Sequence, residues 1–114
     1  MTFEEIKALD HQYVMQSYGR FDVAVDHGRG ATLWDTQGRE YIDFTSGIGV
    51  CSLGYADEGW VNAITEQAGK LGHISNLFYA EPYVKAAEKL CRKAGMSNVF
   101  FANSGAESNE GLIK

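Results

Sequence analysis

Proline and cysteine are scarce in this 114-residue sequence, which contains one proline and two cysteines. Cys51 and Cys91 lack the CxxC or Cys/His spacing of a metal site, so we interpret them as reduced packing residues rather than a disulfide. No apolar run approaches the length that spans a bilayer, and the N-terminus lacks the basic start and apolar core of a signal peptide. We therefore expect a cytoplasmic protein.

Basic residues are also few, because 10 Lys and Arg stand against 15 Asp and Glu and give a net charge of -5. Proteins that bind nucleic acid hold its phosphates with clustered Lys and Arg. The charge balance therefore argues against a nucleic-acid partner. The length and the 45% of hydrophobic residues allow one modest domain with a single core, and no repeat or low-complexity tract interrupts it.

The most informative stretch is a small-residue turn between a predicted strand at 98–102 and a predicted helix. Ser104 is suited to cap that helix, and Glu107 can reach back to the amide of Ser104 in a capping box. Because Gly105 and Ala106 carry little or no side chain, the amides of the first turn stay open to an anion, which the helix dipole favours. An ordinary capped helix is the alternative interpretation of these residues.

The rest of the chain alternates between helical and β-prone segments. Gly28-Arg29-Gly30 is predicted as a hairpin turn, and residues 45–50 as an irregular glycine-rich loop. A helix is expected from Thr2 to Gln16, an antiparallel meander from runs at 21–25, 31–34 and 41–44, and further helices at 58–71 and 82–94. The order indicates an α/β fold: an N-terminal helix, a small antiparallel β-meander, and the start of a helix-covered, mostly parallel sheet.

Three strings resemble motifs of one family, in the same order along the chain: GATLWDTQGREYIDF, SNLFYAEP and NSGAESNEGLIK. They look like the corresponding segments of class III aminotransferases, the pyridoxal 5'-phosphate (PLP) enzymes of fold type I. The likeness spans nearly the whole chain and is densest to the acetylornithine aminotransferases, although LGYADE at 53–58 replaces their usual LGHxHP. The resemblance implies that 1–54 belongs to the small domain and that 55–114 begins the large PLP-binding domain.

The same resemblance implies where the cofactor and the substrate bind. Ser104, Gly105 and Ala106 would hold the phosphate of PLP. Contacts with substrate are expected from two loops, at Gly47, Ile48, Val50, Asn76 and Tyr79. The lysine that forms the Schiff base is expected beyond residue 114, so we assign no catalytic residue and no metal ligand, and we expect residues 1–114 alone to be inactive.

The activity implied by the resemblance is transfer of an amino group from N2-acetylornithine to 2-oxoglutarate, a step of arginine biosynthesis, by a homodimer. A succinylornithine, ornithine or 4-aminobutyrate aminotransferase is the close alternative, since specificity depends on residues outside this sequence. An alternative of another class is a non-catalytic anion-binding or dimerisation module.

Overall fold

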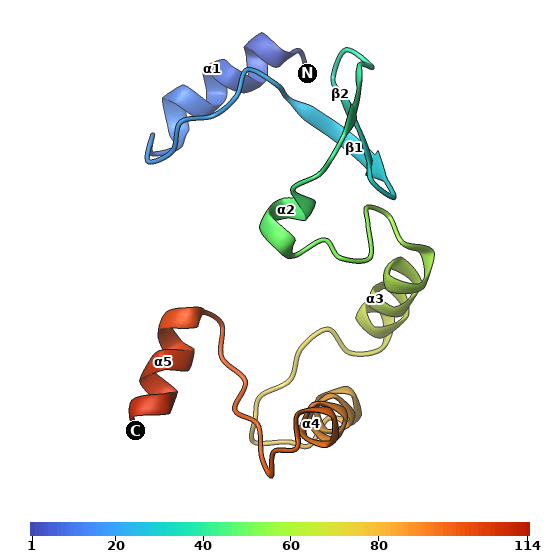
Figure 1. Cartoon of the computed structure of the whole chain (residues 1–114), viewed down its shortest axis with the longest axis vertical. Coiled ribbons are helices and arrows are strands. Elements are labelled where there is room, and N and C mark those ends of the chain that lie inside the picture. Colours follow the sequence, from blue (N-terminus) through green and yellow to red (C-terminus); the bar gives the residue numbers. More distant parts are fainter. The chain divides into compact units, whose positions relative to one another are not determined.

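The computed structural model describes all 114 residues, and they form two units, Met1–Lys70 and Leu71–Lys114. The elements of the first unit are α1 (Phe3–Tyr13), β1 (Val25–Arg29), β2 (Thr32–Asp35), β3 (Glu40–Ile42), α2 (Ser46–Gly49) and α3 (Glu58–Lys70). The second unit contains α4 (Glu81–Ala94) and α5 (Gly105–Ile113) (Figure 1). All the predicted helices are therefore present.

Helix α1 begins with a capping box at Thr2. The amide of Glu5 donates to Thr2 Oγ1 at 3.2 Å, and the amide of Thr2 donates to Glu5 Oε2 at 2.9 Å. Each bond satisfies a backbone donor that the first turn leaves without a partner. The helix ends at Tyr13, three residues before the predicted end. Two ion pairs connect the segment after the helix to the helix, Lys7–Asp22 at 2.6 Å and Arg20–Asp10 at 3.2 Å.

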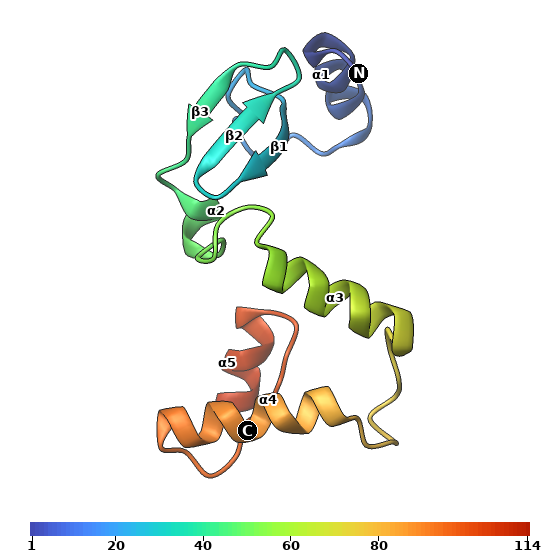
Figure 2. The same ribbon diagram turned by 90° about the vertical axis from the view of Figure 1, so that its right-hand side faces the viewer.

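The three strands form the predicted antiparallel meander in the order β1-β2-β3 (Figure 2). The first strand was predicted at 21–25 but lies at 25–29, where its residues pair with β2. The first hairpin turn was placed too early in the sequence, because Gly28 pairs with Leu33 and the chain turns at Gly30 and Ala31. A Cβ on Gly28 would lie 2.8 Å from both Leu33 Cδ2 and Tyr55 Cγ. This glycine therefore permits close packing inside a strand rather than a turn.

Asp35 at the end of β2 is the one buried residue of the chain, with 4% of its surface exposed. Its carboxylate accepts hydrogen bonds from the amides of Gln37 and Arg39, from Arg39 Nε at 2.7 Å and from the Tyr41 hydroxyl at 2.9 Å. Burial works to raise the pKa of Asp35, but the bonds from Arg39, Tyr41 and Gln37 outweigh burial and hold the pKa well below its usual value. A charged carboxylate therefore organises the turn between β2 and β3.

In the second unit, α4 has Pro82 in its first turn, where the missing amide leaves no helical bond unmade. It ends at Gly95, which adopts the left-handed conformation (φ 67°, ψ 28°) and donates its amide to Cys91 O. Both ends agree with the sequence prediction.

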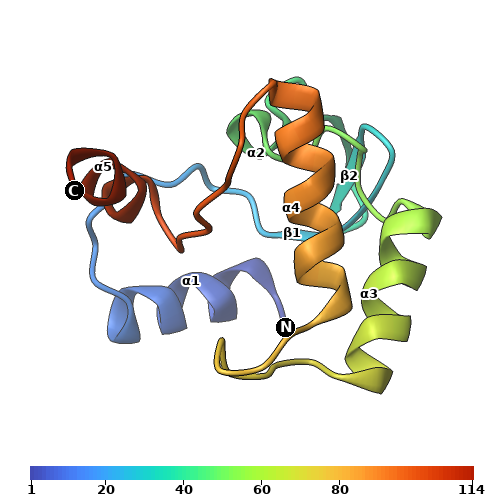
Figure 3. The same ribbon diagram turned by 90° about the horizontal axis from the view of Figure 1, so that it is seen from below.

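The connection from α4 to α5 forms no strand at 98–102, in contrast to the prediction (Figure 3). A strand requires a neighbour to pair with, and the three strands of this chain pair only with one another. Aromatic contacts hold the connection instead. The rings of Phe101 and Tyr83 lie 5.0 Å apart, and the ring of Phe100 lies where it would contact a Cβ on Gly111 at 3.0 Å.

No apolar side chain in the chain is buried. Phe21, Phe44 and Ile48 each expose more than nine-tenths of their surface. Because a stable domain buries most of its large apolar side chains, these residues are available to contact other surfaces. No helix combines the length and the apolar character needed to cross a membrane.

Candidate functional site

The start of α5 has the capped geometry that the sequence predicts, with one difference. Ser104 is the N-cap, and its Oγ accepts a hydrogen bond from the amide of Glu107 at 3.2 Å. The predicted return bond from Glu107 to the amide of Ser104 is wrong. The extended backbone of Ser104 (φ -151°, ψ 161°) instead brings the Asn103 amide to Glu107 Oε2, at 2.6 Å.

The amides of Gly105 and Ala106 remain open at this helix start. Neither donates a hydrogen bond to an acceptor of this chain, and a Cβ on Gly105 would meet no atom within 4 Å. α5 is nine residues long, so its dipole adds to the partial positive charge of the free amides. The carboxylate of Glu107 is occupied by Asn103. These residues fit a phosphate monoester such as that of PLP.

The predicted substrate residues Gly47, Ile48 and Val50 lie on one turn, α2 and the residue that follows it. Gly47 (φ 61°, ψ 35°) and Ile48 (φ 64°, ψ 46°) are in the left-handed helical region, and φ is also positive at Ser46 (48°) and Gly49 (81°). The side chains of Ile48 and Val50 are 95% and 77% exposed. The sequence predicted irregular structure here, whereas the chain forms one turn with left-handed backbone.

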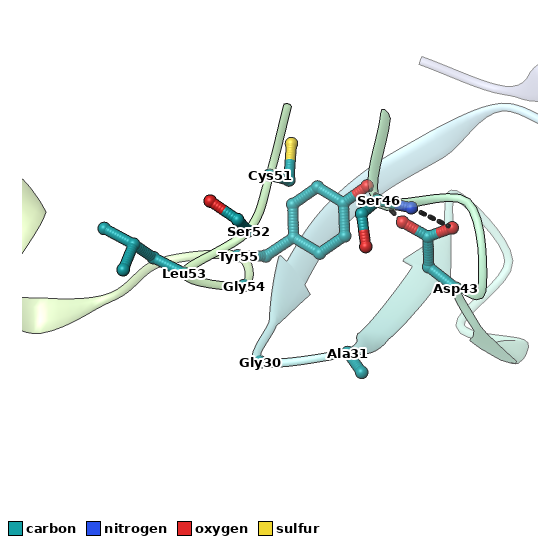
Figure 4. A pocket seen from close by; sticks show the side chains of 9 residues that line it. All are labelled: Gly30, Ala31, Asp43, Ser46, Cys51, Ser52, Leu53, Gly54 and Tyr55. Atoms are coloured by element: carbon teal, nitrogen blue, oxygen red, sulfur yellow. Dashed lines mark hydrogen bonds between the residues drawn. The ribbon is translucent and has the colours of Figure 1, made fainter. Parts of the chain in front are cut away.

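Asp43 anchors this turn through both carboxylate oxygens. Oδ1 accepts from the amide and the hydroxyl of Thr45, at 2.7 and 2.6 Å, and from the amide of Ser46 at 3.2 Å. Oδ2 accepts from the hydroxyl of Tyr55 at 2.7 Å (Figure 4). The hydroxyls of Thr45 and Tyr55 lower the pKa of Asp43 to about 2, and the bond to Asp43 raises the pKa of Tyr55 to about 12.

A hollow of about 290 Å³ lies beside these residues, between the β1–β2 turn and the loop that follows α2. Asp43, Ser46, Cys51 and Tyr55 line it, together with the backbone of Gly30 and Gly54 (Figure 4). Cys51 forms no disulfide, and its thiol is hydrogen-bonded to the hydroxyl of Tyr55. Since the carboxylate of Asp43 already accepts hydrogen bonds from Ser46 and Tyr55, these polar groups of the hollow stabilise the turn.

The remaining predicted substrate residues, Asn76 and Tyr79, lie in the connection between α3 and α4. They belong to the second unit, whereas the α2 residues belong to the first. The Tyr79 side chain is fully exposed and makes no hydrogen bond. A turn at Ser75, whose carbonyl accepts from the amide of Phe78 at 3.0 Å, shapes this connection.

Sequence reasoning did not single out Asp43 or Tyr55. A signal for Asp43 was present. An aspartate side chain often accepts hydrogen bonds from the amides two and three residues later in a turn, here those of Thr45 and Ser46. Tyr55 gave no comparable signal, since its partner lies 12 residues away. No group of three or more His, Cys, Asp or Glu side chains in the chain is arranged to hold a metal ion.

Comparison with known proteins identifies the family. The sequence profile described as Aminotransferase class-III matches residues 13–114. The acetylornithine aminotransferase of Haemophilus ducreyi is 54% identical over 114 residues, which cover 100% of this chain and 29% of that protein. That of Wolinella succinogenes is 56% identical over 109 residues, which cover 95% of this chain and 28% of that protein.

Solved structures agree with the sequence comparison. The acetylornithine aminotransferase of Elizabethkingia anophelis superposes with a TM-score of 0.94 at 31% identity, over 100% of this chain and 30% of that chain. The ornithine aminotransferase of Toxoplasma gondii ME49 superposes with a TM-score of 0.92 at 32% identity, over 99% of this chain and 27% of that chain. This chain spans less than a third of the length of these relatives. The chain belongs to the class III aminotransferase family, with the α/β fold of the fold type I enzymes.

Proposed function

We propose that this chain is the N-terminal part of a PLP-dependent acetylornithine aminotransferase, which transfers an amino group from N2-acetylornithine to 2-oxoglutarate in arginine biosynthesis. The observation that carries the proposal is the open start of α5, where the amides of Gly105 and Ala106 donate to no acceptor of this chain, within a string that resembles the family's phosphate-binding turn. The two relatives that match this chain at 54% and 56% identity are both acetylornithine aminotransferases.

The role of this chain toward the cofactor is to hold its phosphate. Gly105 and Ala106 donate their amides, and Ser104 fixes the first turn so that both amides stay directed out of the helix. When bound, PLP supplies the electron sink that stabilises the carbanion formed during transamination. Glu107 is no phosphate ligand in this proposal, because two negative charges in contact repel each other.

The substrate would meet this chain at the turn that carries Gly47, Ile48 and Val50, and at Asn76 and Tyr79. The exposed apolar side chain of Ile48 suits the methylene chain of N2-acetylornithine, and the hydroxyl of Tyr79 is a free polar group. In the full-length protein we place residues 1–54 in the small domain and 55–114 in the large PLP-binding domain. We also propose a cytoplasmic homodimer, in keeping with the many exposed apolar side chains.

The test is a visible absorption spectrum of the full-length protein reconstituted with PLP, recorded before and after addition of N2-acetylornithine without a keto acid. We expect a visible band from the bound cofactor that N2-acetylornithine bleaches. Ornithine, succinylornithine and 4-aminobutyrate, added in parallel at the same concentration, should bleach it less.

The outcomes separate the candidates. Stronger bleaching by one of the other amines would assign that amine as the donor and keep the family's reaction. If the full-length protein binds inorganic phosphate but gives no visible band with PLP, the assignment as an aminotransferase fails and an anion-binding module is favoured.

A further inference from the structure

The turn at α2 combines strained backbone with an exposed apolar side chain. Ser46 and Ile48 have φ of 48° and 64°, in a region that residues with a Cβ avoid. Ile48 is 95% exposed, so no packing inside this chain offsets the strain. Strained residues of this kind persist where neighbouring contacts impose them, and they cluster at functional sites.

Asp43 imposes the conformation at the entry to the turn. Its Oδ1 accepts three hydrogen bonds, two from Thr45 and one from Ser46, at distances from 2.6 to 3.2 Å. These bonds fix the backbone where φ first becomes positive. The turn is then closed by bonds from the amide of Gly49 to Thr45 O, at 3.0 Å, and from the amide of Val50 to Ser46 O, at 2.9 Å.

Tyr55 fixes Asp43 in turn. Its hydroxyl donates to Asp43 Oδ2 at 2.7 Å, and its backbone exchanges two hydrogen bonds with Gly30, at 2.8 and 2.9 Å. Its ring packs against the backbone of Gly28, where a Cβ would come within 2.8 Å of Cγ. Tyr55 is therefore held on the β1–β2 hairpin by two backbone hydrogen bonds and by the packing of its ring. Its hydroxyl links the α2 turn to the sheet (Figure 4).

We propose that Asp43 and Tyr55 are positioning residues for the amino-donor site: they hold α2 in its left-handed conformation and thereby set where Ile48 meets the substrate. The inference rests on the proposed function, in which Ile48 contacts the donor. Neither Asp43 nor Tyr55 touches the substrate. Because the pKa of Asp43 is about 2 and that of Tyr55 about 12, the carboxylate is charged and the phenol neutral throughout the neutral range.

The test compares Tyr55→Phe with Tyr41→Phe in the full-length holoenzyme. Both variants remove one tyrosine hydroxyl that donates to an aspartate, because Tyr41 donates to Asp35 at 2.9 Å. Only Tyr55 is linked to α2. We measure kcat and KM for N2-acetylornithine, and hydrogen exchange at the amides of Gly49 and Val50.

Tyr55→Phe should raise the exchange rate at these two amides by about tenfold or more, the size expected for loss of one bond to a charged group. It should raise KM for the donor several-fold and leave kcat unchanged, since a substrate contact made equally in the ground and transition states is weakened. Tyr41→Phe should leave both the exchange at Gly49 and Val50 and the KM as in the wild type.

Variants of Asp43 provide the second comparison. Asp43→Asn keeps an oxygen that can accept from Thr45 and Ser46, whereas Asp43→Ala removes every acceptor. KM for the donor should therefore rise less in Asp43→Asn than in Asp43→Ala. If Tyr55→Phe does not accumulate as holoenzyme, the two Asp43 variants decide the proposal by the same measurements.

Wild-type KM and exchange in Tyr55→Phe would overturn the proposal, and so would equal changes in Tyr55→Phe and Tyr41→Phe. If the wild-type protein does not use N2-acetylornithine, the proposed function fails. The exchange at Gly49 and Val50 then decides by itself whether Asp43 and Tyr55 hold the turn.

Discussion

Substitution of Gly54 by alanine tests how closely the loop after α2 approaches the first hairpin. Gly54 has φ of 82°, and a Cβ there would lie 2.9 Å from Gly30 O and 3.0 Å from Gly30 Cα. Because both neighbours are backbone atoms, no side chain can rotate away to make room. Relief requires that residues 54–55 and Gly30 separate, which stretches the two hydrogen bonds between Gly30 and Tyr55.

Gly38→Ala is the matched control for the expected magnitude. Gly38 has nearly the same φ, 79°, but a Cβ there meets nothing within 4 Å. Both alanines carry the cost of a left-handed residue, roughly 1–2 kcal/mol. Gly54→Ala adds the weakening of two hydrogen bonds, about 0.5–1.5 kcal/mol each. The difference of about 1–3 kcal/mol corresponds to about a 5- to 150-fold increase in the local opening constant.

The assay is hydrogen exchange of the full-length protein, followed at the amides of Gly30 and Tyr55. These two amides should exchange faster in Gly54→Ala than in Gly38→Ala by the factor just given. Equal exchange in the two variants would refute the reasoning, because it would show that the backbone of Gly30 yields to a methyl group without loss of its bonds to Tyr55.

Three further predictions concern the phosphate site, the turn and the end of α4. Gly105→Asp should abolish PLP retention because it places a carboxylate among the open amides; unchanged cofactor content after dialysis would contradict the phosphate-site assignment. The pKa of Asp43, about 2, is lowered from 3.8, so its contribution to stability is complete above about pH 4 and lost as the pH falls through 2. The pKa of Tyr55, about 12, is raised from 10.0, so its contribution is complete below about pH 10 and lost as the pH rises through 12. The opening constant at the Val50 amide should therefore not change with pH near neutrality. A change with pH in that range would argue against the hydrogen-bonded pair of Asp43 and Tyr55. Gly95→Ala should destabilise the end of α4 by roughly 1–2 kcal/mol, measured as faster exchange there, because Gly95 is left-handed.

The end of α4 and the start of α5 were predictable because their causes are local, whereas the end of α1 was predicted three residues too late. A serine cap at 104 and a left-handed glycine at 95 each act within one turn, so the sequence around them contains the information. The first hairpin turn was misplaced for the opposite reason. Gly28 is a glycine because the Tyr55 ring packs on it, and local reading cannot distinguish that cause from a turn.

The strand expected at 98–102 shows the limit of composition. Apolar and aromatic residues favour a strand, but hydrogen bonds to a neighbouring strand are what form it, and no strand of this chain pairs there. The open amides of Gly105 and Ala106 were predictable because they are consecutive in the sequence and directly follow the serine cap. The pair of Asp43 and Tyr55 was missed because it joins residues 12 apart, across a turn whose left-handed backbone no periodicity encodes.

The hydrogen bonds that satisfy Asp35 have a consequence for the order of folding. Every partner of its carboxylate lies within six residues, at Gln37, Arg39 and Tyr41. Hairpins form in about 1–10 μs, whereas synthesis adds about 5–20 residues per second, so a ribosome spends tens of milliseconds or more on each residue. Once it is free of the ribosome, the β2–β3 hairpin can thus form in a small fraction of the time that passes before the next residue is added. It reaches its own equilibrium during synthesis, well before the residues of α5 are made.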